Sequence, residues 1–165
     1  MTTPLFDPKR NPFDDLQNAF RRARQEKKNV LLDLGGDWCV WCHRLEAFIR
    51  DHAELRELRD RYYVTVKVYV GSEDETNVEF LNRLPDFDGV PHLLVYNRQG
   101  QLLCSQDTQP LEEGESYHYE RVKSFLARWS EPRLTPYDAL PTAELKRLFE
   151  HEMFDFDDPE QILSA

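Results

Sequence analysis

The sequence predicts an α/β fold in which a central mixed β-sheet is flanked by helices. Two kinds of apolar periodicity carry this prediction. Residues 62–70 alternate at every second position, as in a strand, whereas apolar residues between 12 and 28 recur every three or four positions, as in a helix. The patterns follow one another in the order helix, strand, helix, strand, helix, strand, strand, helix, which is typical of a layered domain.

Local signals place the individual elements. Asn11 before Pro12 is a capping pair, so the first helix is expected to begin there. A turn at residues 97–100 joins the last two strands into a hairpin. The remaining elements are expected at 30–35 (strand), 39–50 and 54–60 (two helical pieces), 62–70 (strand), 78–84 (short helix), 92–96 and 101–105 (strands), 107–117 (polar loop) and 119–129 (helix).

The chain length and a change in amino-acid composition after residue 130 suggest how the chain is divided into domains. A chain of 165 residues can bury one core without disulfide or metal staples, and we expect residues 1–130 to form the α/β domain. Residues 131–141 then contain three prolines, and residues 142–153 have helical spacing. Residues 131–165 are therefore expected to be a C-terminal extension, partly helical, that packs on the domain or trails from it.

Composition excludes several classes of partner. The chain has 31 acidic and 21 basic residues, a formal net charge of -10, which disfavours nucleic acid and anionic membranes. No apolar run approaches the roughly 18 residues that span a bilayer. The N-terminal residues lack the apolar segment of a signal peptide, so a cytoplasmic location is expected, or a periplasmic one if a leader was removed. We expect a monomer.

Residues 30–43, VLLDLGGDWCVWCH, carry the candidate chemistry. An apolar run with a single acid, Asp33, ends at two glycines, and Trp38 and the C-x-x-C pair Cys39 and Cys42 follow. Helical spacing begins after the cysteines, so a strand delivers a dithiol to the first turn of a helix. Free backbone N–H groups and the helix dipole favour a thiolate there, which suits thiol–disulfide exchange.

A C-x-x-C pair also has other uses. A zinc site or an inert buried pair is one alternative, but zinc usually takes four ligands and the sequence has no second cysteine pair. C-V-W-C-H also matches the c-type haem attachment pattern. Haem attachment requires export and usually a distal ligand, whereas the only methionines are Met1 and Met153. Three cysteines in a chain without an export signal argue against a structural disulfide framework.

Three further side chains allow two interpretations each. An ionised Asp33 is costly in an apolar strand, so this acid could accept the proton of Cys42, unless the strand is an edge and Asp33 faces solvent. His43 could stabilise a thiolate when protonated, or be a surface residue of the helix. Cys104, in the predicted hairpin, is expected to be a core thiol, with a regulatory role as the alternative.

Four features together resemble the thioredoxin superfamily, across about residues 13–130. The W-C-x-x-C motif at residues 38–42 lies between a strand and a helix, and Asp33 precedes the first cysteine by six positions. Val90 and Pro91 open the next-to-last strand, where this superfamily has its cis-proline loop. A hairpin and a helix close the domain. Together, in this order, the four features are a specific signal.

The resemblance implies a protein thiol–disulfide oxidoreductase that reduces or isomerises disulfides without a cofactor other than its dithiol. Cys39 would attack the substrate, Cys42 would resolve the mixed disulfide, and Asp33 would serve as the buried carboxylate beneath them. Protein or small-molecule disulfides would be substrates, and a reductase or thiol donor would recycle the dithiol. The residues expected to contact substrate are Trp38, Trp41, Val90 and Pro91, with Val90 offering its backbone N–H and C=O if the bond to Pro91 is cis.

The motif also departs from thioredoxin itself. Val40 and Trp41 replace the dipeptides usual between the cysteines, and His43 stands where thioredoxin usually has a lysine. The W-C-V-x-C form is more similar to the disulfide-interchange and thioredoxin-like branches. The competing class is a non-catalytic thioredoxin-fold module that binds a partner through residues 131–165 and the Trp41 surface.

Overall fold

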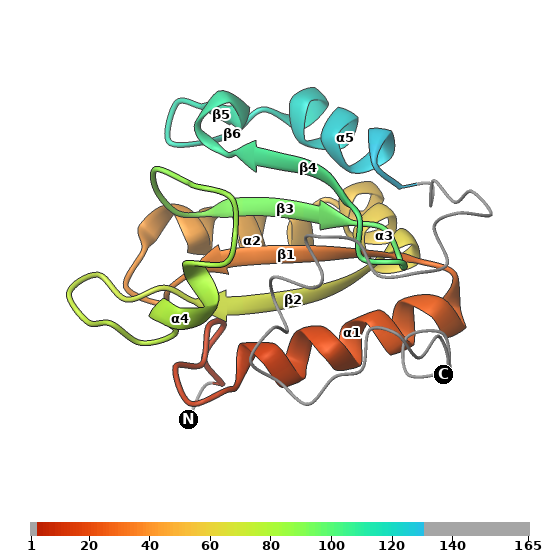
Figure 1. Cartoon of the computed structure of the whole chain (residues 1–165). Coiled ribbons are helices and arrows are strands. Elements are labelled where there is room, and N and C mark those ends of the chain that lie inside the picture. Colours follow the sequence, from red (N-terminus) through yellow and green to blue (C-terminus); the bar gives the residue numbers. More distant parts are fainter. Residues whose placement is uncertain (1–2, 131–165) are drawn as a thin grey trace.

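Strand β1 (Asn29–Gly35) is buried along its whole length, and the sheet is built around it. It pairs in parallel with β2 (Tyr63–Tyr69) and antiparallel with β3 (His92–Tyr96). Strand β4 (Leu102–Asp107) pairs antiparallel with β3 and completes the order β2-β1-β3-β4. The computed structural model describes residues 3–130 (Figure 1). The predicted mixed sheet is confirmed.

Helices cover both faces of this sheet. Helices α1 (Pro12–Glu26) and α4 (Val78–Leu81) lie on one face, and α2 (Val40–Asp51), α3 (Ala53–Tyr62) and α5 (Tyr119–Arg128) lie on the other. The core beside α1 includes Phe13, Leu16, Leu32, Val66 and Phe80. The core beside α2 includes Leu31, Ile49, Leu55, Val95 and Phe125. Within residues 3–130, no helix is both long enough and apolar enough to cross a membrane.

Strand alternation decides which side chains lie under α2. Successive side chains of a strand point to opposite faces, so Leu32 packs toward α1, whereas Leu31 and Asp33 lie on the α2 face. In β2, Val66 likewise joins the α1 core, which leaves Lys67 on the α2 face. The parallel register pairs Asp33 with Lys67. Two opposite charges therefore meet beneath the helix that carries the cysteines.

Most predicted elements are present, with shifted ends and one error. Helix α2 begins at Val40, one residue after the predicted start, and α3 follows directly after His52. Residues 107–117 are not the predicted loop throughout: they include a 3₁₀ turn (Gln109–Leu111) and a hairpin of β5 (Glu112–Glu113) and β6 (Ser116–Tyr117). Two-residue strands are too short to show a period. The predicted extension, residues 131–165, lies outside the described residues.

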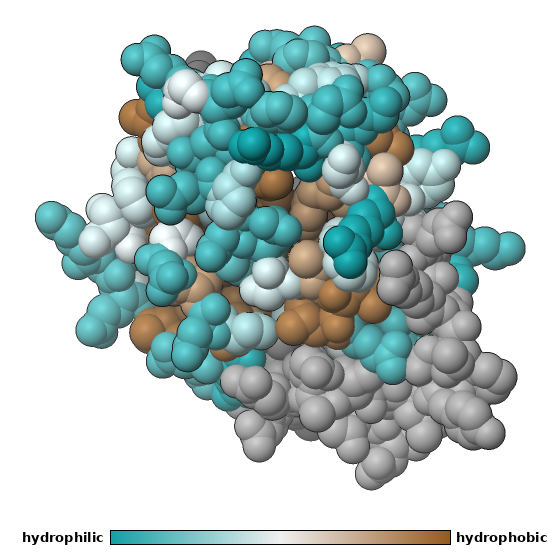
Figure 2. All heavy atoms as spheres, turned by 90° about the horizontal axis from the view of Figure 1, so that it is seen from above, coloured by the Kyte–Doolittle hydropathy of each residue, from teal (hydrophilic) through white to brown (hydrophobic). Residues whose placement is uncertain are grey.

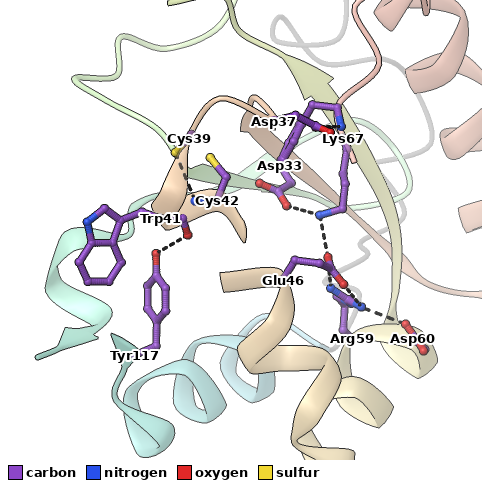
Figure 3. Close-up of polar contacts among 11 residues, drawn as sticks. Asp33, Asp37, Cys39, Trp41, Cys42, Glu46, Arg59, Asp60, Lys67 and Tyr117 are labelled. Atoms are coloured by element: carbon purple, nitrogen blue, oxygen red, sulfur yellow. Dashed lines mark hydrogen bonds and ion pairs between the residues drawn. The ribbon is translucent and has the colours of Figure 1, made fainter. Parts of the chain in front are cut away.

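A network of ion pairs connects α2 with α3 and β2. Glu46 of α2 accepts two hydrogen bonds from Arg59 of α3, at 2.9 and 3.1 Å, and its Oε1 lies 2.8 Å from Nζ of Lys67 (Figure 3). The side chains are 12–21% exposed. Paired oxygens and guanidinium nitrogens are a strong and directional contact. The network therefore fixes how α2 docks over the sheet.

The network shifts the protonation of its members. Burial alone would raise the pKa of Glu46, but Lys67 and Arg59 outweigh burial and hold that pKa below its usual 4.5. Burial alone would lower the pKa of Lys67, but Asp33 and Glu46 raise it above its usual value. A depressed carboxylate pKa stabilises the fold above the unfolded-state pKa, and that stability is lost as pH falls through the folded-state pKa.

Replacing Glu46 with glutamine is expected to destabilise the protein by about 2 kcal/mol at pH 7, since charge-assisted hydrogen bonds to Arg59 and Lys67 are lost. The difference from wild type should shrink progressively below about pH 4.5, where wild-type Glu46 takes up a proton. Urea denaturation of wild type and Glu46→Gln at a series of pH values measures this difference in stability.

Glu79→Gln is the matched control because Glu79 is 63% exposed and pairs only across one helical turn with Arg83. This control should change stability by about 0.5 kcal/mol or less. A destabilisation by Glu46→Gln that stays constant between pH 7 and pH 3 would contradict the electrostatic explanation.

Candidate active site

The two cysteines occupy the junction between β1 and α2. Cys39 caps α2, and its Sγ accepts a hydrogen bond from the backbone N–H of Cys42 at 3.2 Å. Gly35, at the end of β1, permits this approach: a Cβ there would lie 2.6 Å from Sγ of Cys42 and 2.7 Å from the ring of Phe6. The predicted strand–dithiol–helix arrangement is therefore present, with both thiols reduced.

Burial distinguishes the two thiols only slightly. Cys39 is 7% exposed and Cys42 is 3% exposed, so Cys39 is the more accessible, in the order that the resemblance implies. Burial raises the pKa of Cys42 strongly, and a hydrogen bond with Cys39 and the charges of Cys39 and Asp33 add to that rise, against a backbone hydrogen bond from Gly36. Cys42 is therefore a protonated thiol near neutral pH and needs a base to ionise.

Asp33 lies beneath the dithiol, as the sequence suggested, and not at a solvent-facing edge. It is 7% exposed in the central strand, and its carboxylate lies between Cys42 and Lys67 (Figure 3). Nζ of Lys67 donates to its Oδ2 at 2.7 Å. Its buried Oδ1 has no hydrogen-bond partner among the described residues. One oxygen of Asp33 is thus paired with Lys67, whereas the other has no hydrogen-bond partner among the described residues.

The N-terminal segment covers the dithiol with an aromatic ring. Phe6 is 1% exposed and forms a small cluster with Cys39 and Cys42. Asp37 fixes this segment because its carboxylate accepts the backbone N–H groups of Leu5 at 3.2 Å and Phe6 at 2.8 Å. The residues before α1 therefore form part of the wall of the site.

Val90, Pro91 and Trp38 lie around Cys39. The Val90–Pro91 peptide bond is cis, as the resemblance implied. Sγ of Cys39 lies 3.7 Å from the Val90 carbonyl oxygen, within reach of a weak S–H···O bond. Trp38 is 48% exposed, and its indole N–H donates to the carbonyl of Val70 at 2.8 Å. An apolar surface therefore borders the more accessible cysteine.

Trp41 is less exposed than its place between the cysteines suggested. Its ring is half-buried and meets the ring of Tyr117 edge to face, with centroids 5.5 Å apart. The guanidinium of Arg44 lies 4.6 Å from the Trp41 ring centroid on the same helix. The hydroxyl of Tyr117 donates to the Trp41 carbonyl at 3.3 Å. Contact with β6 restrains this side chain.

The side chains of His43 and Cys104, the other candidate residues, lie in different surroundings from those of Cys39 and Cys42. His43 is exposed, and its Nε2 contacts the Asp37 carbonyl at 2.7 Å. Cys104 lies in a groove of about 440 Å³ between β4 and α5, and burial raises the pKa of its thiol.

Figure 2, which views the molecule from the side of α5 and β4, shows a largely hydrophilic surface with smaller hydrophobic areas. Within residues 3–130, no group of three or more His, Cys, Asp or Glu side chains could hold a metal.

Sequence reasoning missed four side chains of the site. Lys67 could be found only from the β1–β2 register, and Glu46 and Tyr117 only from the docking of α2 against its neighbours. Phe6 carries no periodic signal because its segment is irregular. Each of these residues joins the site through tertiary contacts.

Comparison with curated proteins finds partial similarity to two kinds of protein. The thiol:disulfide interchange protein DsbD of Vibrio cholerae is 31% identical over 87 residues, which are 53% of this chain and 14% of that protein. Human spermatogenesis-associated protein 20 is 38% identical over 52 residues, which are 32% of this chain and 7% of that protein. The chain thus spans only a small part of the length of these relatives.

Structural comparison agrees on the fold. A disulphide isomerase from Xylella fastidiosa Temecula1 superposes with a TM-score of 0.65 at 21% identity, covering 79% of this chain and 100% of that chain. At this identity the similarity speaks for the fold alone. A family model described as thioredoxin-like matches residues 11–98, which are more than half of the chain. The chain therefore belongs to the thioredoxin-like family.

Proposed function

We propose that this protein is a thiol–disulfide oxidoreductase that reduces or isomerises disulfides through Cys39 and Cys42. The observation that carries the proposal is the arrangement of the dithiol: Cys39 Sγ accepts the Cys42 N–H, and Asp33 lies beneath Cys42. The similarity to thiol:disulfide interchange proteins supports the same chemistry. No cofactor is required, since the dithiol itself carries the two electrons.

In the first step the thiolate of Cys39 attacks one sulfur of the substrate disulfide. A mixed disulfide forms, the substrate S–S bond breaks, and the departing thiolate takes a proton from solvent. Two features stabilise the attacking thiolate: the N–H of Cys42 and the other free N–H groups in the first turn of α2. Attack also requires access, so Phe6 or its neighbours must yield space to the substrate.

In the second step Cys42 resolves the mixed disulfide. Its proton passes to Asp33, and its sulfur then attacks Sγ of Cys39. The second substrate thiolate leaves and is protonated, so the substrate gains two electrons and two protons while the cysteines become a disulfide. Lys67 keeps a positive charge beside Asp33 throughout, because the carboxylates around it raise its pKa. A thiol donor then restores the dithiol.

The surface around Cys39 suits an extended polypeptide with an apolar side chain next to its cysteine. Val90 presents its backbone near Sγ of Cys39, and Trp38 and Val40 are exposed beside it. We therefore propose protein disulfides as the main substrates. The potential of the dithiol in glutathione buffer decides between reductant and oxidant, since relatives span about -270 to -120 mV.

A non-catalytic, partner-binding module is the second candidate function. One observation favours it: Phe6 packs on both cysteines and leaves Cys39 only 7% exposed. The two functions differ in whether Cys39 forms covalent intermediates, and this difference can be measured directly.

Cys42→Ser is expected to accumulate mixed disulfides through Cys39, because the resolving thiol is gone while the attacking thiol remains. The variant is incubated with a disulfide-containing protein such as insulin and analysed by non-reducing electrophoresis and mass spectrometry. These methods should detect a covalent complex that a reductant cleaves. Wild-type protein should reduce insulin disulfides in the presence of a small thiol donor.

Two controls sharpen the trapping experiment. Cys39→Ser should trap nothing, and Cys104→Ser in the Cys42→Ser background should trap as much as Cys42→Ser alone, since Cys104 lies in the separate groove beside α5. The absence of any trapped species, together with no insulin reduction by wild type, would support the partner-binding module instead.

Asp33→Asn is expected to lengthen the lifetime of the mixed disulfide about 100-fold, the effect typical of losing a positioned general base. Cys42, whose pKa burial raises, would lose its proton acceptor, whereas attack by Cys39 should change little. Acid-quenched single turnovers analysed by mass spectrometry separate the two steps.

Asp51→Asn makes the same change of charge at an exposed residue at the end of α2, and it should leave both steps unchanged. Equal slowing of attack and resolution in Asp33→Asn would contradict the role of Asp33 as the base for Cys42.

A further inference from the structure

One peptide unit in the C-x-x-C turn is hydrogen bonded on both sides. Its carbonyl, from Trp41, accepts the hydroxyl of Tyr117 at 3.3 Å, and its N–H, from Cys42, donates to Sγ of Cys39 at 3.2 Å (Figure 3). The hydroxyl of Tyr117, the Trp41–Cys42 peptide and the Cys39 sulfur therefore form one continuous chain. This chain runs from strand β6 to the sulfur that attacks the substrate.

The Tyr117 hydroxyl is the donor in its hydrogen bond to the Trp41 carbonyl. A carbonyl oxygen can only accept, so the shared proton belongs to the hydroxyl. Tyr117 is 4% exposed; burial raises the pKa of its hydroxyl, a hydrogen bond with Thr108 opposes that rise, and the negative charges of Glu112, Cys42 and Cys39 add to it. The hydroxyl therefore stays protonated while the thiols are being used.

Packing holds the Tyr117 ring in place. The Trp41 ring meets it at an interplanar angle of 87°, and the Phe48 ring centroid lies 6.1 Å away. Strand β6 belongs to the short hairpin after β4, beyond residues 11–98 that the family model matches. Tyr117 thus reaches the dithiol turn from outside the segment that the family model matches.

We propose that Tyr117 is a positioning residue that strengthens the hydrogen bond from the Cys42 N–H to the Cys39 thiolate. Donation to an amide carbonyl polarises the amide and makes its N–H a better donor, and linked hydrogen bonds strengthen one another by about 10–30% each. The polarised N–H stabilises the negative charge on Cys39. The consequence for turnover rests on the function proposed above, but the effect on the thiolate does not.

Tyr117→Phe tests this relay, because it removes the hydroxyl and keeps the ring that packs on Trp41 and Phe48. The thiolate absorbance of the reduced protein at 240 nm is followed against pH in a Cys104→Ser background, because Cys104 is a third thiol outside the dithiol and would add to the signal. We expect the midpoint of thiolate formation to rise by about 0.3 pH unit, a twofold loss of thiolate at a given pH below it.

Tyr63→Phe is the matched control. Tyr63 is also buried, and its hydroxyl also donates to a helix carbonyl, that of Leu126 at 2.7 Å, but this carbonyl belongs to α5 and not to the dithiol turn. The Tyr63→Phe variant should unfold at a lower temperature than wild type, but its thiolate midpoint should not move. An unchanged midpoint in Tyr117→Phe, or an equal shift in both variants, would overturn the proposal.

The shift of the thiolate midpoint can be measured whether or not the protein proves to be an oxidoreductase. Insulin reduction and mixed-disulfide trapping by wild type test whether the protein is an oxidoreductase, whereas the thiolate midpoint requires no substrate. A protein that traps nothing but shows the midpoint shift would retain the relay and lose the oxidoreductase activity. A protein that reduces insulin without the shift would retain the activity and lose the relay.

Discussion

The ion pair between Lys67 and Asp33 is the contact on which the site depends. An unpaired carboxylate would be costly in the central strand, and Lys67 offsets that penalty at 2.7 Å. Lys67 can do so only if β1 and β2 pair in their observed register, and Glu46 and Arg59 in turn hold Lys67 from α2 and α3. Sheet register and helix docking are therefore linked to the charge beneath the dithiol.

The dithiol itself depends on the start of α2. Cys39 replaces the usual oxygen-bearing cap, and its sulfur accepts the N–H that a serine or aspartate oxygen would otherwise take. The same N–H that satisfies the helix end thus stabilises a developing thiolate. Cys42 lies one turn further in, where burial keeps it protonated. Helix geometry therefore gives Cys39 and Cys42 different surroundings, although they are only three residues apart.

The site combines residues inside the segment that the family model matches with residues on both sides of it. The matched residues 11–98 supply the cysteines, Asp33, Lys67 and the cis Val90–Pro91 bond. Phe6 comes from before that segment and Tyr117 from after it, and both contact the dithiol turn. Both therefore lie where they can affect access to Cys39 and the hydrogen bonds around its sulfur.

The sequence by itself determined the elements and the position of the dithiol, because period, caps and motif spacing are local signals. Asn11 does accept the N–H groups at the start of α1, and the Asp33 side chain does lie under Cys42. Only the tertiary structure decided what surrounds them. Lys67 meets Asp33 through strand register, Glu46 reaches Lys67 through helix docking, and Tyr117 lies in a hairpin too short to leave a period in the sequence. These partners are distant along the chain, and no local pattern records a contact that folding alone creates.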